Sequence, residues 1–569
     1  MSFNEHVGGI KDMSYNLILK NCRVVDGTGN TWFRADIAIK DGKIAKLARR
    51  IEGEIDETID VKELIVSPGF IDPHDHSDSV ILQNPTADAK VGQGCTTMLA
   101  GNCGGSIAPL TEKGREYIGQ RVARTDGINV DWSSFGEYLD RVEKSGVAAN
   151  FACLVGHHTI RADVIGLEDR APTDAEMSEM KSLVAQSMEG GAFGMSTGLY
   201  YVPGEFATTE EVIELAKVVA KYNGIYASHV RCIPTVEWGG ITRDPEGVRE
   251  ACVIGEKAGL PVQISHYQTH SPYDRGKEDK MLEQLEIARE RGVEVTGDLM
   301  PSIWGTSSTQ TTLPFWAQEG GLSKILERLR DEETREKIRK DMPERAKYST
   351  PAWFITYGKP ERLRLYHSEK HPEFNWKTLK VIAESMGTDP LTAQFDLTIE
   401  EGKILSFLTK NHYEEDIRTA LKHPTSMVST DASAIGPRSP FTKQHANPRA
   451  YGIYPLTFRK YVRDETRSEM PDEVGTKLLT IQEFVRKSTS MAAQVMGLFD
   501  RGLIREGMWA DLVVFDPETF SDVATYEDTH HHPVGIDYVF VNGTLVWKKG
   551  KHTGTFPGKV LRGPGYKQR

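Results

Sequence analysis

The stretch SPGFIDPHDHSD, residues 67–78, joins a short apolar run to a pair of histidines. Pro68 and Gly69 interrupt the apolar run ELIVSPGFID, so we expect a strand on each side of them. His74 and His76 follow the second strand, and side chains two residues apart on a strand point to the same face. Two imidazoles on one face, bracketed by aspartates, predict a metal site at the end of a buried strand.

Downstream of this stretch, from about residue 70 to residue 500, short apolar runs alternate with helical patterns. The runs include NFACLVG, GAFGMS, GIYASHV, PVQISH, VEVTGDL and SMVSTDAS, and the helical patterns include TTEEVIELAKVVAKYNG and KMLEQLEIARERG. This alternation predicts an α/β protein with a parallel sheet, and its length fits a TIM-like (β/α)8 barrel. In that fold the chemistry lies at the carboxyl ends of the strands.

Both ends of the chain are rich in strand patterns, such as ADIAIKDGKIAKLA near the start and GIDYVFVNGTLVWKKGKHTG near the end. We therefore predict a small β-sandwich domain made from residues 1–68 and 502–569, beside a barrel made from residues 69–501. A charged helix and an irregular, aromatic-rich stretch interrupt the barrel pattern at residues 318–410. We interpret this stretch as an insertion over one rim, either a lid or a packing or oligomer element.

Composition narrows the class of protein. The 569 residues carry a formal net charge of -12 without a long basic run, which argues against a nucleic-acid partner. There is no apolar segment of membrane length and no leader-like N-terminus, so we expect no membrane partner. Six cysteines in so long a chain do not make a disulfide framework, so we expect a cytoplasmic protein. A homo-oligomer is left open.

Four more donor side chains stand where an apolar run gives way to a polar loop: Cys103, His229, His266 and Asp431. Each alone is more often a satisfied core residue. Together with the two histidines they form a set of N, S and O donors that suits zinc and is large enough for two ions. A bound metal lowers the pKa of its water, and Asp431, the only carboxylate of the set, is our general base and later general acid. The set predicts hydrolysis at a polarised carbonyl.

Other candidates are weaker. Cys103 could instead be a nucleophile with a histidine base, but zinc accounts for more of the residues together. We expect buried thiols at Cys95, Cys153, Cys232 and Cys252. The run His530 to His532 predicts a surface or interface role rather than a metal site. His157 and His158 follow a strand, and whether one of them faces the site stays open.

Several motifs together resemble the N-acyl-D-amino-acid deacylases (D-aminoacylases) of the amidohydrolase superfamily. They are SPGFIDPHDHSD, GNCGGSIAP, GMSTGLYYVPGEFAT, SHVR, ISH, STDAS and NPRAYGIYP, and both chain ends fit as well. The resemblance covers nearly the whole chain. It implies a TIM-like barrel with a small β domain and zinc at the barrel mouth, and Cys103 in place of the carboxylated lysine of many relatives.

The resemblance also implies roles for single residues. Cys103, His229 and His266 would hold one tight zinc, and His74, His76 and Asp431 would form a second, weaker site. Arg449, in Asn447-Pro448-Arg449, would pair with the substrate carboxylate, and Thr306 stands where a serine commonly assists. Met300 stands where the family usually has a tyrosine that holds that carboxylate, so we expect this contact to be weaker and, with Trp304 nearby, the substrate to be bulkier or more apolar.

These observations predict a zinc-dependent hydrolase that cleaves linear amides of the N-acyl-D-amino acid type by attack of a metal-activated water. The small-molecule partner would then be an N-acyl amide. One alternative is a cyclic amidase of hydantoinase type or a lactonase with the same metal chemistry. Another is a non-catalytic scaffold that keeps the fold, although such a chain would be expected to have lost metal ligands.

Overall fold

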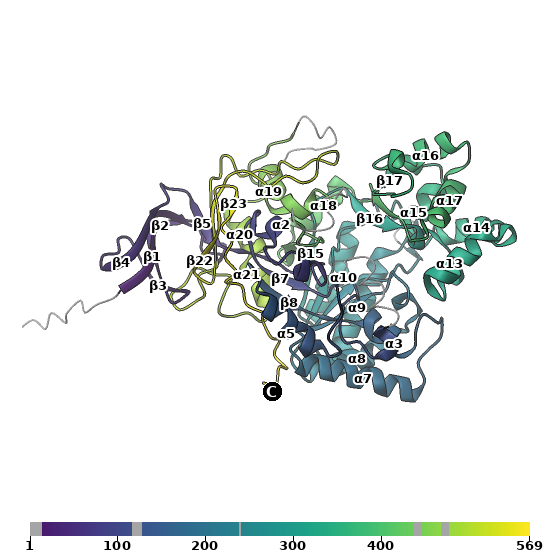
Figure 1. Cartoon of the computed structure of the whole chain (residues 1–569), viewed down its shortest axis with the longest axis horizontal. Helices are drawn as coiled ribbons and strands as arrows, with labels where there is room; N and C mark the ends of the chain where they lie inside the picture. The colour runs from purple at the N-terminus through teal and green to yellow at the C-terminus, as the bar shows by residue number, and fades with distance from the viewer. Residues whose placement is uncertain (1–13, 116–127, 238–239, 437–446, 468–476, 569) are drawn as a thin grey trace, which may run out of the picture.

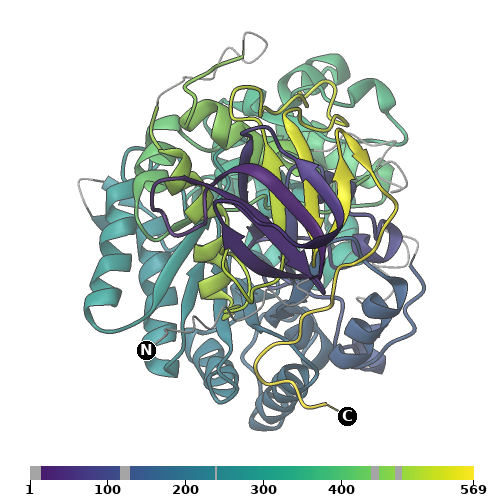
Figure 2. The ribbon, with the colours of Figure 1, turned by 90° about the vertical axis from the view of Figure 1, so that its left-hand side faces the viewer.

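The computed structural model describes residues 14–115, 128–237, 240–436, 447–467 and 477–568. Strands from the two chain ends pair into one sheet of nine strands, in the order β23-β22-β21-β20-β5-β1-β2-β3 with β4 beside β1. The first part of the chain supplies β1 (Ser14–Val24), β2 (Phe33–Lys40), β3 (Lys43–Ala48), β4 (Glu54–Asp60) and β5 (Ile65–Pro68). The last part supplies β20 (Leu512–Phe515), β21 (Ile536–Val541), β22 (Thr544–Lys548) and β23 (Lys551–His552). Figure 2 shows the purple and yellow strands side by side.

Turn residues set the hairpins of this sheet. Asp41 and Gly42 join β2 to β3 with φ of 51° and 79°, and Asn542 and Gly543 join β21 to β22 with φ of 47° and 78°. Positive φ at both central positions suits the right-handed twist of a hairpin, and Asp-Gly and Asn-Gly supply it at low cost. Both hairpins predicted from the sequence are confirmed.

The middle of the chain forms parallel strands. One sheet holds β6 (Phe70–Asp72), β7 (Cys95–Ala100) and β8 (Asn150–Cys153). The other holds β9 (Val155–Gly156), β10 (Gly194–Gly198), β11 (Ile225–His229), β14 (Val262–Ile264), β15 (Val295–Leu299) and β19 (Ser426–Val428). Leu154 alone separates β8 from β9, and a parallel bridge between Asp75 and Ala432 joins the chain after β6 to the chain after β19. The predicted α/β class is confirmed.

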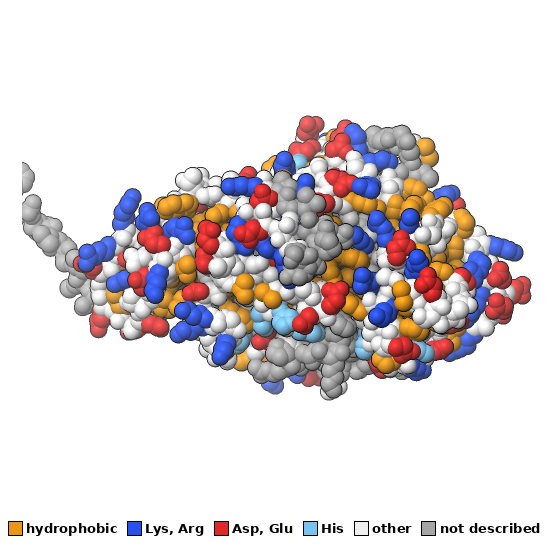
Figure 3. All heavy atoms as spheres, turned by 90° about the horizontal axis from the view of Figure 1, so that it is seen from above, with side chains coloured by type: hydrophobic (Ala, Val, Ile, Leu, Met, Phe, Trp, Pro, Cys, Tyr) orange, Lys and Arg blue, Asp and Glu red, His pale blue; other side chains and the backbone are white. Residues whose placement is uncertain are grey.

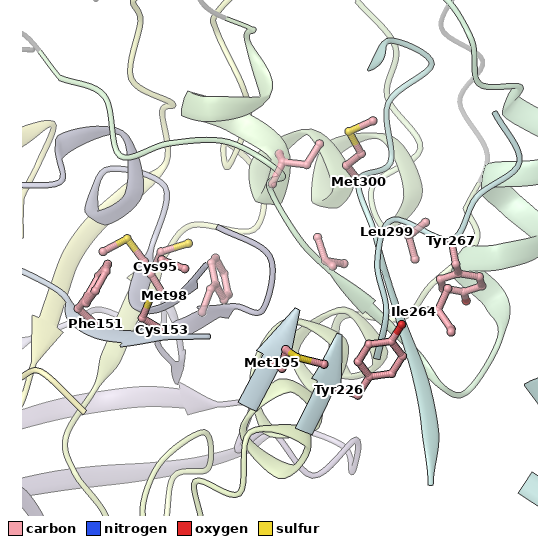
Figure 4. Packing of buried hydrophobic residues seen from close by; sticks show 14 of the residues in the cluster. Cys95, Met98, Phe151, Cys153, Met195, Tyr226, Ile264, Tyr267, Leu299 and Met300 are labelled. Atoms are coloured by element: carbon pink, nitrogen blue, oxygen red, sulfur yellow. The ribbon is translucent and has the colours of Figure 1, made fainter. Parts of the chain in front are cut away.

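Helices pack around these strands (Figure 1). They include α2 (Asp88–Val91), α5 (Phe135–Ser145), α6 (His157–Val164), α7 (Asp174–Glu189), α8 (Thr209–Ala220), α9 (Asp244–Ala258), α10 (Glu278–Glu290), α18 (Glu414–Lys422), α19 (Arg449–Tyr461), α20 (Ile481–Ser488) and α21 (Ser490–Val495). Thr173 begins α7 with a capping box to Glu176, which satisfies backbone N–H groups that the first turn leaves unpaired. The core between strands and helices is apolar, as Figure 4 shows for Met195, Ile264 and Leu299.

The predicted buried thiols are confirmed: Cys95, Cys153, Cys232 and Cys252 are all at most 4% exposed. All six cysteines are free.

The chain between β15 and β19 carries a separate subassembly, at the right of Figure 1. It contains an antiparallel sheet of β16 (Gly305–Ser308), β18 (Ser406–Thr409) and β17 (Leu363–Leu365), with β18 in the middle. Its helices are α11 (Thr309–Thr312), α12 (Phe315–Gln318), α13 (Gly321–Arg330), α14 (Glu332–Arg345), α15 (Thr350–Thr356), α16 (Leu379–Met386) and α17 (Pro390–Glu401). Two apolar clusters of its own support it, one around Phe354 and Phe407 and one around Ile325 and Phe395.

One expectation in this region was wrong. Within the aromatic-rich stretch expected to be irregular, PAWFITYG (residues 351–358) lies mostly in α15. Ser349 caps the first turn by accepting from the Ala352 N–H, and Pro351 suits the first turn of a helix.

On the face in Figure 3, outside its grey atoms, acidic and basic side chains are intermixed, so this face has no large basic patch of the kind that binds phosphates. Within the described parts of the chain, none of the helices has both the length and the apolar character needed to span a membrane.

Candidate metal centre

The six predicted donor residues come together at the carboxyl ends of the parallel strands. His74 and His76 follow β6, Cys103 follows β7, His229 ends β11, His266 follows β14 and Asp431 follows β19. Backbone φ is positive at three of them: 52° at Cys103, 30° at His266 and 45° at Asp431. Non-glycine residues adopt such conformations only where the surroundings impose them, and functional sites are where they gather.

Cys103 is the centre of the group. Its Sγ lies 3.3 Å from His74 Nε2, 3.6 Å from His229 Nδ1 and 3.6 Å from His266 Nε2. These are the separations of donors that share one small ion, since zinc binds sulfur at about 2.3 Å and nitrogen at about 2.0–2.1 Å in a tetrahedral arrangement. Two groups of three donors, one with His74 and His76 and one with His229 and His266, both contain Cys103.

The charge around Cys103 favours a thiolate. Burial alone would raise the pKa of the thiol, but the charge of His74 and the contacts with His229, His266 and His74 outweigh it and hold the pKa well below its usual range. A thiolate is the form of cysteine that binds metals.

The glycine loop before Cys103 lets the backbone pass close to neighbouring strands. Gly101 has a φ of 78°, and a Cβ placed on it would lie 2.0 Å from the Leu154 carbonyl oxygen. Gly104 has a φ of 77°, and a Cβ there would lie 2.7 Å from the His158 ring. Glycine is thus required at both positions by conformation and by space.

His157 and His158 have their own partners. His157 Nε2 lies 2.9 Å from Glu211 Oε1, and His158 Nε2 lies 2.9 Å from the Gly198 carbonyl oxygen. Of the two, His158 packs against the loop that carries Cys103, and neither belongs to the donor groups found in the described residues.

Asp298 is part of the site and was missed by the sequence analysis. Its carboxylate lies 3.2 Å from His74 Nδ1 and accepts from the His266 backbone N–H at 3.0 Å. A carboxylate on the far nitrogen of a metal-binding histidine fixes the ring orientation and tautomer. The signal was present: Asp298 lies near the end of the run VEVTGDL, where other runs carry donors.

Asp431 lies between two basic groups. Its Oδ1 is 3.0 Å from His76 Nε2, and its Oδ2 is 2.8 Å from Arg449 Nη2. Burial would raise the pKa of Asp431, but Arg449 and His76 outweigh burial and hold it well below the usual range. His76 in turn has its pKa raised to about 10, because the contacts with Asp431 and Cys103 outweigh the effect of burial.

The predicted substrate-binding residues lie at the mouth of this centre. Met300 and Thr306 line one pocket together with His229, His266 and Asp431. Arg449, at the start of α19, is 8% exposed and lines a neighbouring pocket. It contacts two residues of the first pocket, since its Nη1 lies 2.6 Å from Met300 Sδ and its Nη2 lies 2.8 Å from Asp431 Oδ2.

A third group of donors lies beside the pocket. Cys232 Sγ is 3.9 Å from His270 Nε2, and His270 Nδ1 is 3.3 Å from Asp244 Oδ2. The charge of Arg243 acts on both Cys232 and Asp244 and opposes a cation there. We interpret this group as a hydrogen-bonded chain that fixes the His270 ring at the pocket wall.

The histidine run near the end of the chain lies elsewhere. His530 Nδ1 lies 3.1 Å from the Tyr451 hydroxyl, His531 pairs with Asp528, and His532 packs on Trp547. Within the described residues no group of metal donors includes them.

Comparison with known proteins gives one family for most of the chain. The model of the amidohydrolase family matches residues 57–332 and 409–547, leaving out most of the subassembly between β16 and β18. The D-aminoacylase of Alcaligenes xylosoxydans xylosoxydans is 29% identical over 549 residues, which cover 96% of this chain and 97% of that protein.

Two solved structures are similar over the same length. One is the N-acyl-D-glutamate deacylase of Bordetella bronchiseptica, complexed with zinc and a phosphonate inhibitor that mimics the tetrahedral intermediate. It has a TM-score of 0.76 and 27% identity, and the match covers 96% of this chain and 100% of that chain. The other is a D-aminoacylase described by its binuclear metal centre, with one-metal activation and second-metal attenuation, at the same TM-score, identity and coverage.

Proposed function

The chain belongs to the amidohydrolase family, and from this premise we propose that it hydrolyses the amide bond of N-acyl-D-amino acids with zinc as its metal. The observation that carries the proposal is the convergence of the Cys103 sulfur with nitrogens of His74, His229 and His266 at 3.3–3.6 Å. Relatives that cover 96% of the chain are named as enzymes that deacylate D-amino acids, which supports a linear amide as the substrate.

The fold proposal follows from the strand pairing. We propose that eight parallel strands form a TIM-like barrel, with β8 and β9 as one strand interrupted at Leu154 and with the bridge from Asp75 to Ala432 beside the junction of the first and last strands. Our domain proposal has three parts. They are a composite β-sandwich of residues 1–68 and 502–569, a barrel of residues 69–501, and an insertion into that barrel near residues 318–410. The six free thiols support a cytoplasmic location.

We propose that Cys103, His229 and His266 hold one tight zinc ion, and that His74, His76 and Asp431 form a second, weaker site. The residues present fit this metal: a thiolate, imidazoles and a carboxylate are its usual ligands. Asp298 supports the set from outside by orienting His74 and by holding the His266 backbone. Zinc, when bound, acts as a Lewis acid and lowers the pKa of a water molecule.

Asp431 has the position of the proton carrier. Its carboxylate faces the donor set through His76 and faces the pocket, which it helps to line. It can take a proton from the attacking water and then give it to the leaving amine nitrogen, because an amide does not release an unprotonated amine anion in water. His229, in the pocket wall, is 5% exposed, and burial of this wall would limit the access of competing water to the reacting groups.

Arg449 is our candidate for the substrate carboxylate. Its side chain is buried and contacts Asp431, which lines the pocket, and a planar guanidinium can hold a carboxylate through two parallel hydrogen bonds. Thr306 and Met300 line the same pocket. Met300 and Trp304 remain our reason to expect a bulkier or more apolar substrate than an N-acetyl derivative of a small amino acid.

The proposal is tested by assaying the zinc-loaded protein on N-acyl-D-amino acids, their L-enantiomers, hydantoins and lactones side by side. We expect turnover of the D-compounds, loss of turnover after chelation, and recovery when zinc is restored. Turnover of hydantoins or lactones alone would indicate a cyclic amidase or lactonase. A protein that binds no zinc and remains stable in chelator would indicate the scaffold alternative.

A further inference from the structure

The pocket at the metal centre is also lined by polar side chains that have no part in the proposed mechanism. We call them the polar wall: His270, Ser307, Thr350, Thr409, Asn411 and His412. They come from the chain after β14, from the small antiparallel sheet and the residues after it, and from the start of α15. The pocket therefore offers hydrogen bonds to a part of the substrate other than the reacting amide.

Most members of the polar wall use their hydrogen bonds within the protein. The Ser307 and Thr409 hydroxyls bond to each other at 2.5 Å. Thr350 donates to the His270 carbonyl at 2.7 Å, and the His270 ring itself lies 3.3 Å from an Asp244 carboxylate oxygen. The members that keep an unused side-chain nitrogen are Asn411 and His412.

His412 supplies a hydrogen-bond acceptor. It is 6% exposed, and its Nδ1 lies 3.1 Å from the Thr269 carbonyl oxygen. A carbonyl oxygen only accepts, so Nδ1 carries the proton and Nε2 keeps a lone pair. Burial and the charge of His270 lower the pKa of His412 to about 3, so the ring is neutral. Nε2 makes no hydrogen bond to any residue that the structure describes, and buried polar groups of this kind usually have a partner in a ligand or a water.

Asn411 supplies a donor next to this acceptor. Its Oδ1 accepts from the Gly305 N–H at 3.0 Å, which orients the side-chain amide and makes Nδ2 its free end. Nδ2 has no hydrogen-bond partner in the described parts of the chain. A Cβ on Gly305 would lie 3.2 Å from Asn411 Nδ2 and 3.2 Å from His412 Nε2. Both nitrogens thus lie near one point of the pocket lining, close enough for one small group to reach both.

Two cations of the same small sheet have another partner. The Arg364 guanidinium on β17 and the Lys410 ammonium after β18 lie 5.9 and 5.7 Å from the centre of the Trp304 ring. Neither is among the described residues that line this pocket. A carboxylate at the polar wall would therefore face the lone pair of Nε2 and would find no cation within the wall.

We propose that Asn411 and His412 bind a primary carboxamide of the substrate and make the enzyme selective for substrates that carry one. The carboxamide N–H would donate to His412 Nε2, and its carbonyl oxygen would accept from Asn411 Nδ2. A carboxylate of the same shape lacks the donor, and an isopropyl group lacks both donor and acceptor. The methylene groups that lead to a carboxamide are apolar, which agrees with Met300 in the pocket lining.

The inference rests on the proposed function and names its substrate class, so its test measures binding rather than turnover. N-methylsulfonyl-D-glutamine, whose sulfonamide replaces the hydrolysable amide, is titrated calorimetrically into the zinc-loaded protein. The D-glutamate and D-homoleucine analogues place a carboxylate and an isopropyl group where glutamine has its carboxamide. A second set places the same three groups at the end of an ethylsulfonyl chain on D-alanine. The two sets distinguish a carboxamide on the amino-acid side chain from one on the acyl group.

In one of the two sets we expect the carboxamide ligand to bind about 10-fold or more tightly than the other two ligands. The isopropyl ligand leaves Asn411 Nδ2 and His412 Nε2 without partners, and the carboxylate ligand cannot donate to Nε2. The inference is overturned if the carboxamide ligand is not the tightest binder in either set. This comparison uses the unchanged protein and so does not depend on the folding of a variant.

A substitution then assigns the preference to one side chain. His412→Asn removes the acceptor at the Nε2 position, while its amide N–H can replace Nδ1 as the donor to Thr269. We expect the variant to bind the carboxamide and isopropyl ligands with similar affinity. His423→Asn is the matched control and should keep the preference, since His423 bonds Thr425 at 2.7 Å and is not one of the described pocket residues.

A preference for the carboxamide that persisted in His412→Asn would contradict the assigned role of His412. Failure of the protein to hydrolyse any N-acyl-D-amino acid would overturn the proposed function and leave these affinities valid.

Discussion

In the proposed function, Asp431 serves two tasks with one carboxylate. Its two oxygens have different partners: His76, a proposed metal ligand, and Arg449, the proposed contact of the substrate carboxylate. A carboxylate with both oxygens in ion pairs is held in one orientation, and its position then depends on both neighbours. Binding of a second carboxylate at Arg449 would therefore change the ion pair between Arg449 and Asp431, because the two anions would share one guanidinium.

Replacing this carboxylate should separate chemistry from folding. Asp431→Asn keeps the shape and most hydrogen bonds but cannot carry the proton, so we expect kcat to fall about 10²–10⁴-fold, the usual contribution of a positioned acid–base group. The tight zinc, assigned to Cys103, His229 and His266, should remain, as metal analysis of the same sample would show. A kcat close to that of the unchanged enzyme would remove Asp431 from the role of base.

His158 should make the protein sensitive to acid. Burial and the nearby His157 lower its pKa to about 3, below the usual 6.5. Between these two values the unfolded chain binds a proton at this residue that the folded chain does not. Stability should therefore fall as pH drops from 6.5 towards 3, by up to about 1.4 kcal/mol per pH unit from this residue.

The check is urea unfolding of metal-free protein at several pH values in this window, so that loss of metal does not contribute. His158→Asn should be less stable overall but should lose less stability on acidification than the unchanged protein. Parallel curves for the two proteins would show that His158 is not the cause of the acid sensitivity.

At the scale of elements, Lys90 on the short helix α2 connects the first and last parallel strands. Its Nζ lies 2.6 Å from Asp72 Oδ2 and 2.7 Å from Asp75 Oδ2, and it also donates to the Thr430 hydroxyl and the Ala432 carbonyl. All of these groups flank the segments that carry His74, His76 and Asp431. Lys90, Asp72 and Asp75 are all completely buried. Water could therefore not compensate the charges of the two aspartates if the lysine were removed.

Removing this cation should destabilise the protein strongly. Lys90→Met leaves Asp72 and Asp75 buried together without compensation, and we expect a loss of about 3–5 kcal/mol in the free energy of unfolding. Lys324→Met is the control, since its pair with Glu327 is exposed and should contribute at most about 1 kcal/mol. Equal midpoints of urea unfolding for the two variants would contradict the assigned role of Lys90.

Elements with local signals could be predicted from the sequence, and long-range contacts could not. The strands that lead to His74, Cys103 and His229 were found because apolar runs and polar ends follow each other directly in the chain. Lys90 gave no such signal, because its partners Thr430 and Ala432 lie about 340 residues away. The elements between β15 and β19 were not predicted one by one, because their helices and strands are stabilised by contacts within the subassembly rather than by a repeated pattern.

At the scale of the whole molecule, the C-terminal tail fastens the composite sheet to the parallel strands. The Gly558 N–H donates to the Val147 carbonyl and the Leu561 N–H donates to the Phe151 carbonyl, so the tail runs along β8. Arg562 pairs with Asp140 and Glu143 on α5. The tail thus contacts the parallel strands after leaving the composite sheet.

A truncated chain should show what this tail contributes. Ending the chain at residue 556 removes these backbone hydrogen bonds, and we expect the melting temperature to fall by about 5 °C or more. A chain that ends at residue 565 keeps them and should melt close to the full-length protein. If both truncations melted like the full-length chain, the tail would be a passive extension.

The pairing of β5 with β20 also has a consequence for synthesis on the ribosome. β5 ends at Pro68 and β20 begins at Leu512, so more than four hundred residues must be translated before the partner of β5 exists. Until then β5 presents an open, apolar edge next to the growing parallel strands, and such edges invite pairing with other nascent chains. We therefore expect the first strands of the composite sheet to need shielding from other nascent chains until β20 has been made.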